Sequence, residues 1–513
     1  MGMTDAEARD GSPIAHDKLI FWGCFFALVA TAFGFVVRGM VMTDWAREFN
    51  LSSTQMGEIF GVGLWPFAIS IVLFSLIIDK VGYGRAMAFA FCCQVGGMLL
   101  TVFANGYDTL YWATFILALG HGTVEAVINP VVATMFPREK TKWLNILHAG
   151  WPGGLVLGGL LAIGMGQAGW QMKVALILIP VFIYGVMLFG RKFPVHERVA
   201  AGISYRDMLK EAGAIGAFIV ISLMTWELGR VFEFGYIARV SVIVALTVTY
   251  GIYVRSLGRP LFIFLLLIMM PLAITELGTD SWITPLMEGE MGRMNLNPAW
   301  VLVYTSFIMM VLRFCSGPIV HQFSPLGLLA VSSVIAAIGL TGLSMATGLT
   351  ILLAATVYGV GKTFFWGTML GVVAEQFPRG GAVTLNAIGG VGLLSVGIIG
   401  AAFLGQIQDK YVMTRLETEN RTLYETYQAP SKLSVFGTYT PLDRDRLAEG
   451  PEEHQTAVAE VSEAASKNAL RTVAIFPAVM FFCYLALIFY FRSRGGYRAI
   501  YLTEGGREEH IAT

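Results

Sequence analysis

The stretch VVATMFPR at residues 131–138 returns 241 residues later as VVAEQFPR at 372–379, with six of eight positions identical. The same offset holds through the residues that follow, where Leu144-Asn145 aligns with Leu385-Asn386 and Gly159 aligns with Gly400. Two unrelated helices that shared only a loop motif would not stay in register for so long. The chain is therefore interpreted as an internal duplication, and its two halves are expected to have the same architecture.

The composition indicates a membrane protein. Apolar residues make up 56% of the chain and charged residues 14%, and the runs 19–37 and 261–274 contain no charge. A helix that crosses a bilayer needs about 20 such residues, so the lipid bilayer is an expected partner. The net charge of zero gives no field that would attract nucleic acid. All five cysteines lie in apolar segments, which argues against disulfides and metal clusters, and no cofactor is expected.

The order of apolar segments predicts an all-α integral membrane protein with six helices in each half and two further transmembrane helices between the halves, about fourteen spans in total. The expected divisions are a cytoplasmic N-terminal tail (1–18), an N-terminal six-helix bundle (19–190), a cytoplasmic connector (191–212), an inserted helix pair (213–259), a C-terminal six-helix bundle (260–491) and a cytoplasmic C-terminal tail (492–513). The polar loop 408–470 would face outward, and its ends would continue the flanking helices.

Lys and Arg gather in alternate short loops, which places both termini in the cytoplasm by the positive-inside rule. The expected location is the plasma membrane, the inner membrane of a bacterium. No nucleotide-binding G-x-x-x-x-G-K-[ST] pattern is present, so ATP is not expected to be a power source, and no enzymatic activity is expected.

Ionisable residues inside apolar spans mark candidate sites, because a charge in the bilayer is costly unless it faces a partner or a wet cavity. His121, Glu125 and Asn129 recur at i, i+4 and i+8 and share one helix face. The repeat places Lys362 and Trp366 at the positions of His121 and Glu125, so an acid and a base are expected near the midplane from opposite halves. Arg38 lies alone in the first span and is expected to face Glu125.

Further candidates lie on other spans. Glu276 and Asp280 are four residues apart, with Asp280 expected near the outer surface. Asn145 and His148 share a face of the fifth helix, and Asn386 repeats Asn145. Amides suit the recognition of hydroxyl groups, although hydrogen bonding between helices explains buried asparagines equally well.

The segment 79–85, Asp-Lys-Val-Gly-Tyr-Gly-Arg, resembles the loop signature after the second helix of the major facilitator superfamily. The pattern Glu125-x-x-x-Asn129-Pro130 followed by Leu144-Asn145 is similar to the fourth and fifth helices of its fucose-permease-like proton symporters. The pair Arg313-Phe314 resembles their turn between the eighth and ninth helices. The resemblance implies a gating or structural loop role for Asp79, Lys80, Gly82, Arg85, Arg138, Arg313 and Arg379. Those symporters carry an aspartate in the region of the first helix where this chain has Arg38.

These features predict a secondary active transporter, expected to be a monomer, that takes up a sugar or another small hydroxylated solute together with protons by alternating access. Glu125 is the expected proton carrier. Arg38 is interpreted either as the counter-ion of Glu125 or as a ligand for an anionic substrate. The expected substrate-binding residues are Arg38, His121, Asn129, Asn145, His148, Glu276, Asp280, Lys362, Trp366 and Asn386. An organic-anion or sugar-acid carrier, a proton-driven exporter and a non-transporting membrane sensor remain as alternatives.

Overall fold

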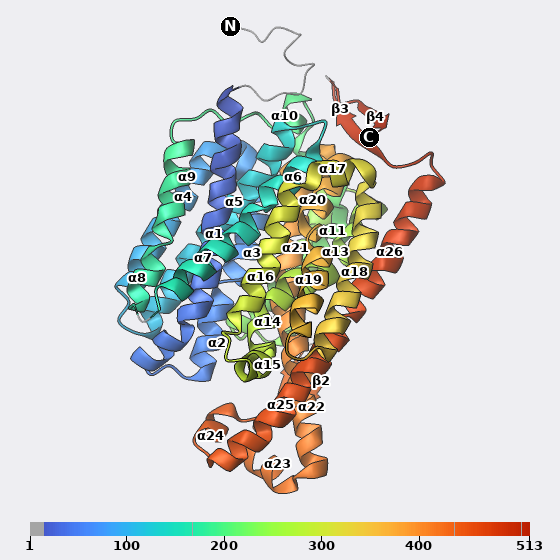
Figure 1. Ribbon diagram of the computed structural model, residues 1–513. Coiled ribbons are helices and arrows are strands. Elements are labelled where there is room, and N and C mark those ends of the chain that lie inside the picture. The colour runs from blue at the N-terminus through green and yellow to red at the C-terminus, as the bar shows by residue number, and fades with distance from the viewer. Residues whose placement is uncertain (1–14, 167, 435–436, 504, 513) are drawn as a thin grey trace.

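The computed structural model describes residues 15–166, 168–434, 437–503 and 505–512, and helices dominate it (Figure 1). Twelve helical segments of the described residues are long and apolar enough to cross a membrane. This number includes the two helices at 205–231 and 236–254, and it omits the shorter apolar helix Ala299–Phe314. The expectation of an all-α membrane fold is confirmed.

The first part of the chain is a bundle in which several spans are broken into two pieces. Its helices are α1 (Ala15–Glu48), α2 (Ser53–Val62), α3 (Trp65–Val81), α4 (Tyr83–Val102), α5 (Tyr107–Met135), α6 (Lys140–His148), α7 (Gly150–Gly164), α8 (Trp170–Ala175) and α9 (Leu178–Leu188). A capping box begins α2, where the Ser52 hydroxyl accepts from the Gln55 N–H at 3.2 Å. Gly82, with φ of +86°, makes the turn between α3 and α4.

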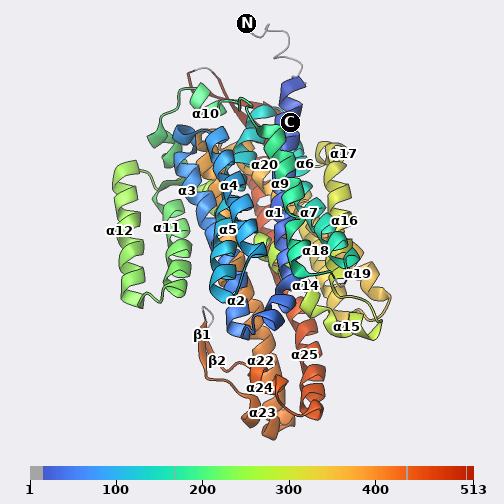
Figure 2. The ribbon, with the colours of Figure 1, turned by 90° about the vertical axis from the view of Figure 1, so that its left-hand side faces the viewer.

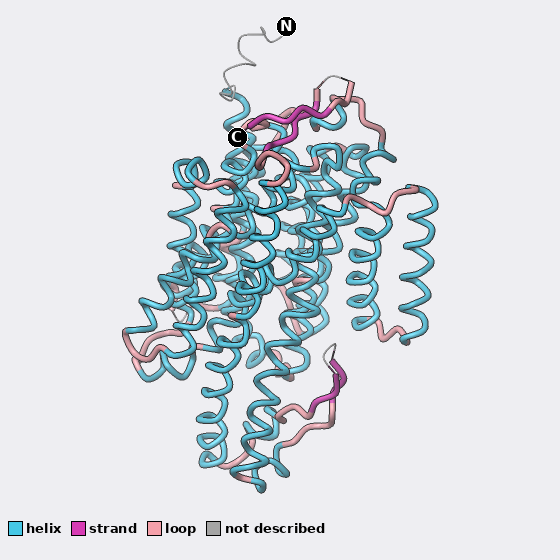
Figure 3. Tube along the Cα trace, turned by 90° about the vertical axis from the view of Figure 1, so that its right-hand side faces the viewer, coloured by secondary structure: helices cyan, strands magenta, loops and turns pink. Residues whose placement is uncertain are grey.

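The middle of the chain forms a helical hairpin beside the bundle (Figures 2 and 3). After the short α10 (Glu197–Ala200), α11 (Tyr205–Val231) and α12 (Tyr236–Val254) run side by side. The inserted helix pair was expected to start at residue 213. In the structure α11 begins earlier, in the connector, and kinks at Gly213, whose φ is +60°. A Cβ on Gly213 would lie 1.9 Å from the Gly258 nitrogen, so this crossing requires glycine.

The hairpin touches the rest of the protein through α11. Met224 and Leu228 of α11 pack against Trp65 of α3, and Leu209 packs with Val383 of α21, which belongs to the later part of the chain. In α12, by contrast, Val254 is the one residue recorded as buried. The outer helix thus leaves an apolar surface free for lipid.

The last part of the chain is a second bundle. It comprises α13 (Pro260–Ala273), the π-helix η1 (Ile274–Gly278), α14 (Thr279–Leu286), α15 (Glu288–Arg293), α16 (Ala299–Phe314), α17 (Ser316–Gln322), α18 (Pro325–Met345), α19 (Thr350–Lys362), α20 (Phe365–Gln376), the 3₁₀-helix η2 (Pro378–Gly380), α21 (Gly381–Ser395), the π-helix η3 (Val396–Gly400), α22 (Ala401–Glu419) and α26 (Ile475–Arg492). Repeat-matched glycines let helices approach closely in both bundles. A Cβ added at Gly120 would lie 3.0 Å from the Ala90 oxygen, and one added at the matching Gly361 would lie 2.3 Å from the Ala336 nitrogen.

The segment 408–470 builds a separate structure on the side of the molecule opposite both chain ends (Figure 1). Here α22 extends beyond the bundle, α25 (Glu452–Val473) leads into α26, and α23 (Arg421–Tyr427), α24 (Arg444–Ala448) and the hairpin β1 (Lys432–Ser434) with β2 (Gly437–Tyr439) lie between them. We call residues 408–470 the cap. Its own small core includes Val412, Leu416, Tyr427 and Val458, separate from the core of the bundle.

An ionic network ties the cap to the segment after α14. Arg293 contacts Glu463 at 2.6 Å and Glu290 at 2.5 Å, and Lys467 contacts Glu290 at 2.5 Å. At the other end of the molecule the C-terminal segment forms the hairpin β3 (Arg498–Leu502) with β4 (Glu508–Ala512).

Candidate functional site

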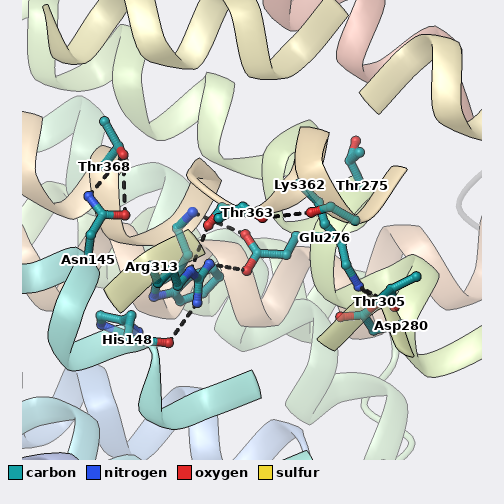
Figure 4. Close-up of polar contacts among 12 residues, drawn as sticks. Asn145, His148, Thr275, Glu276, Asp280, Thr305, Arg313, Lys362, Thr363 and Thr368 are labelled. Carbon is teal, nitrogen blue, oxygen red and sulfur yellow. Dashed lines mark hydrogen bonds and ion pairs between the residues drawn. The ribbon is translucent and has the colours of Figure 1, made fainter. Parts of the chain in front are cut away.

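Arg313 lies at the centre of the bundle, with 1% of its side chain exposed (Figure 4). Arg313 lies in the last turn of α16, next to the break before α17, and its guanidinium points into the interior. Its Nη2 donates to Glu276 Oε1 at 2.8 Å, its Nε to the Thr363 carbonyl at 2.6 Å and its Nη1 to the His148 carbonyl at 2.8 Å. Arg313 therefore bonds to both halves of the protein.

A break between α19 and α20 explains the partners of this ion pair. The helix ends at Lys362 and resumes at Phe365, so backbone groups near the break lack helical partners. Arg313 Nε donates to the free Thr363 carbonyl, and Glu276 Oε2 accepts from the Trp366 N–H at 3.0 Å. Glu276 itself lies in the π-helix η1, a distortion often found at functional sites.

Lys362 and Asp280 form a second buried ion pair within the same half. Lys362 Nζ also lies 3.3 Å from the Thr305 hydroxyl. Lys362, expected near the midplane opposite Glu125, is paired within its own half, and Asp280, expected near the outer surface, is buried. Matching positions in a repeat occupy equivalent places in their own halves, so they do not have to meet.

Glu125 has an amide as its partner. Asn129 Nδ2 donates to Glu125 Oε2 at 2.7 Å, and Asn129 Oδ1 lies 2.9 Å from His148 Nε2. Within the part of the chain that the structure describes, Glu125 forms no ion pair. The three residues thus make one hydrogen-bonded line from α5 to α6, which ends next to the carbonyl that Arg313 binds.

Arg38 is buried but does not contact Glu125. Its guanidinium carbon lies 5.9 Å from the ring centroids of both Phe35 and Phe60. Gly63 makes room for it, since a Cβ there would lie 1.9 Å from Arg38 Nη1. The expected ion pair between Arg38 and Glu125 is absent from the described residues, and α2 and its aromatic ring occupy the space beside the guanidinium instead.

The two repeated asparagines join helices. Asn145 Nδ2 donates to the Thr368 hydroxyl at 3.1 Å, and Asn386 Nδ2 donates to the Ala126 carbonyl at 3.0 Å. Both bonds connect the N-terminal half to the C-terminal half. Hydrogen bonding between helices, one of the two interpretations of these residues, therefore holds in this conformation.

The halves also meet near the end of the molecule that carries the termini. Glu375 Oε1 accepts from the Thr141 hydroxyl at 2.5 Å, and Lys140 Nζ donates to the Ala374 carbonyl at 3.1 Å. Gly371 brings α20 against α6, since a Cβ at this position would lie 2.3 Å from Thr141 Oγ1. Sequence reasoning missed Glu375, although it is a lone charge near the end of a span.

This close approach gives a first prediction. Gly371→Val should reduce substrate uptake at least about tenfold, because the added methyl groups cannot fit against Thr141 without separating the helices. Gly96→Val is the matched control, since a Cβ at Gly96 meets nothing within 4 Å. Uptake by both variants, measured on monodisperse protein in proteoliposomes, checks this. Wild-type uptake by Gly371→Val would show that this contact does not have to close.

The residues of the expected gating loop lie at the same end as Thr141 and Glu375. Asp79 pairs with Arg198, Lys80 Nζ lies 5.9 Å from the Tyr205 ring centroid, and Gly82 makes the turn described above. Arg379 lies 3.9 Å from Glu508 of β4, while Arg85 and Arg138 are exposed. These contacts tie the loop to the connector and to the C-terminal hairpin.

Nearby, His196 is buried beside two cations. Burial, with Lys140 and Arg198 close by, lowers the pKa of His196 to about 3. The neutral ring accepts a hydrogen bond from the Arg198 N–H at 3.1 Å. His196 therefore helps to hold the connector without adding charge.

A small cavity of about 10 Å³ lies between the halves, which is room for about one water molecule, so it must widen before a small-molecule substrate can enter. Five of its nine lining residues were expected as site residues from the sequence: Glu125, His148, Glu276, Trp366 and, as a gating residue, Arg313. The others are Phe67, Trp151, Leu277 and Leu393. Sequence reasoning missed Phe67 and Trp151, because an aromatic residue in an apolar span carries no distinguishing signal. Trp151 follows His148 by three residues, which is the one hint that it shares the His148 face.

The model of the Major Facilitator Superfamily matches residues 24–402, and the chain belongs to this family of membrane transporters. A gentisate transporter of Corynebacterium glutamicum is 25% identical over 194 residues, 37% of this chain and 43% of the relative. A hexuronate transporter of Bacillus subtilis is 27% identical over 176 residues, 33% of this chain and 39% of the relative. The chain thus matches less than half of the length of each of these relatives.

Solved structures share the fold. The human organic anion transporter MFSD10 superposes with a TM-score of 0.60 at 10% identity, over 91% of this chain and 99% of that one. The Escherichia coli fucose:proton symporter FucP superposes with a TM-score of 0.50 at 15% identity, over 89% of this chain and 98% of that one. The resemblance inferred from the loop and helix motifs is confirmed at the level of the superfamily and its symporter structures.

Proposed function

We propose that the protein is a secondary active carrier of small organic carboxylates. The observation that supports this is a group of buried nitrogens without partners. Arg38 Nε, Trp151 Nε1 and His121 Nε2 have no hydrogen bond to the described residues. Buried polar groups in proteins are nearly always paired, and the first two of these are donors that an anionic ligand would satisfy.

The charges of the C-terminal half support the same choice. Arg313 and Lys362 are each paired with a carboxylate, whereas Arg38 forms no ion pair with any carboxylate of the described chain. A guanidinium suits a carboxylate because its donors match the two oxygens. Gentisate and hexuronate are the names of carboxylate anions, so the relatives add support. A neutral sugar would leave Arg38 without a counter-charge.

Glu125 is proposed as the proton carrier. It lines the cavity, is 5% exposed and is bound by an amide rather than by a cation. A carboxylate in that position can gain or lose a proton as the cavity opens to either side, so the charge of the site changes with conformation. Asn129 and His148 hold Glu125 in place through the hydrogen-bonded line described above.

The proposed arrangement places two six-helix bundles at 19–190 and 260–491 around this cavity, with α11 and α12 as an additional pair. α16 and the broken helix α19–α20 would complete the second bundle, giving fourteen spans. The proposed monomer lies in the plasma membrane with both termini in the cytoplasm, where the Lys- and Arg-rich loops at that end would lie.

The test is uptake into proteoliposomes. Labelled 3-hydroxybenzoate, glucuronate and glucose are supplied with and without an imposed pH gradient. We expect one or both carboxylates to accumulate and glucose not to. Arg38→Ala should weaken carboxylate transport by at least about tenfold, as expected for the loss of a charge-assisted pair. Arg421→Ala, at an arginine of the cap that is 78% exposed, should not. Uptake of glucose alone would overturn the proposal and restore the sugar interpretation.

A further inference from the structure

Three of the nine residues that line the central cavity are large aromatic residues. Phe67 comes from α3, Trp151 from α7 and Trp366 from α20, and their side chains are 3%, 7% and 6% exposed. Two halves of the protein therefore contribute aromatic faces to one small space. Leu277 and Leu393 complete the apolar part of the wall.

The charged groups of the same wall are already bound. Glu276 accepts from Arg313 and from the Trp366 backbone, and Glu125 accepts from Asn129. Each hydroxyl of a sugar acid would need a partner of its own, and an unpaired hydroxyl in a dry site is penalised. The amide nitrogens of Asn145 and Asn386, which would suit hydroxyl groups, donate to partners on other helices, and neither residue lines the cavity.

The aromatic surface continues from the cavity toward the unpaired cation. The Trp151 ring lies 5.8 Å from the Phe35 ring, and the Arg38 guanidinium lies 5.9 Å from the Phe35 centroid. The Trp151 N–H is buried and has no partner among the described residues. These groups would match a ligand that has one anionic end and a planar apolar body. A dicarboxylate would need a second free cation, and Arg313 is held by Glu276.

We propose that the substrate is a small aromatic monocarboxylate, its ring against Trp151 and Trp366 and its carboxylate directed to Arg38. This inference rests on the proposed function and narrows it, because aromatic rings stack favourably on aromatic side chains. Among the two carboxylates of the uptake assay, 3-hydroxybenzoate is therefore the expected substrate.

The experiment measures competition with labelled 3-hydroxybenzoate in proteoliposomes. Glucuronate should compete at least about tenfold less well than unlabelled 3-hydroxybenzoate, since a site built for a ring leaves extra hydroxyls unpaired. Trp366→Leu should weaken 3-hydroxybenzoate binding about tenfold or more, and Trp366→Phe, which keeps a ring, by less than about threefold. Trp112→Leu is the matched control, because Trp112 is 58% exposed on the outside of α5.

Trp366 packs against Gly392, with ring atoms 3.0 Å from where a Cβ would lie, so Trp366→Leu could unfold the protein. Trp151→Phe provides a second variant: it keeps the ring and removes the free N–H, and it should weaken 3-hydroxybenzoate while leaving the neutral analogue 3-hydroxybenzyl alcohol unaffected as a competitor. Accumulation of glucuronate without 3-hydroxybenzoate would overturn this inference and leave the proposed carboxylate carrier intact. Accumulation of neither would overturn the proposed function itself.

Discussion

Arg313→Leu should lower the free energy of unfolding by about 3–5 kcal/mol and abolish transport, because it leaves the buried Glu276 carboxylate without its counter-ion. It would also free the Thr363 and His148 carbonyls, which Arg313 now binds in different halves. The loss is measured as the fall in thermal unfolding temperature of detergent-purified protein, together with uptake.

Two controls distinguish the loss of the buried ion pair from a general loss of stability. In Arg313→Met with Glu276→Gln no charge is left unpaired, so most of the stability should return while transport stays absent. Arg415→Leu breaks a pair with Glu419 in which both side chains are about half exposed, 50% and 51%, and it should cost about 1 kcal/mol or less. A single Arg313→Leu variant as stable as the wild type would contradict the central position of this residue.

Glu125→Gln should abolish accumulation driven by a pH gradient while leaving exchange of substrate across the membrane within about threefold of wild type, because the new amide mimics the protonated acid and does not release a proton. The amide oxygen can still accept from Asn129, so the local geometry is kept. Uptake against a concentration gradient and exchange at equal concentrations are measured in the same vesicles.

Glu58→Gln is the matched control for that experiment, since Glu58 is an exposed carboxylate that accepts from the Tyr107 hydroxyl. It should accumulate substrate as the wild type does. Gradient-driven accumulation at the wild-type rate in Glu125→Gln would remove Glu125 from the coupling mechanism.

The superfamily and the helical order were predictable because long apolar runs and the repeated VVA-x-x-FPR segment are properties of the sequence itself. The place of Glu125 in the cavity was also predictable, since a carboxylate in the middle of a span must face the interior. Its partner was not, because which groups pair depends on how helices rotate against one another.

Arg313 and Lys362 illustrate what the sequence left open. Arg313 looks like a charge at the end of a span, but α17 extends the segment beyond the end of α16, and the Arg313 side chain is buried in the core. Lys362 appears to face Glu125 across the repeat, but the break before Phe365 and the nearby η1 bring it to Asp280. Helix breaks and π-helices change which side chains meet, and residue spacing alone does not reveal them.

The cap has a practical consequence for sidedness. It lies at the end of the molecule opposite the start of α1 and the C-terminal hairpin (Figure 1), and in the proposed arrangement a bilayer around the bundles separates these two ends. When the protein is reconstituted, each carrier would therefore expose either the cap or the opposite end to added reagents. Proteolysis in the exposed α23–α24 region, where Arg421 and Arg444 offer trypsin sites, would count the fraction of carriers in each orientation. Dividing the measured substrate flux by the number of carriers in each orientation gives a transport rate for each direction across the membrane.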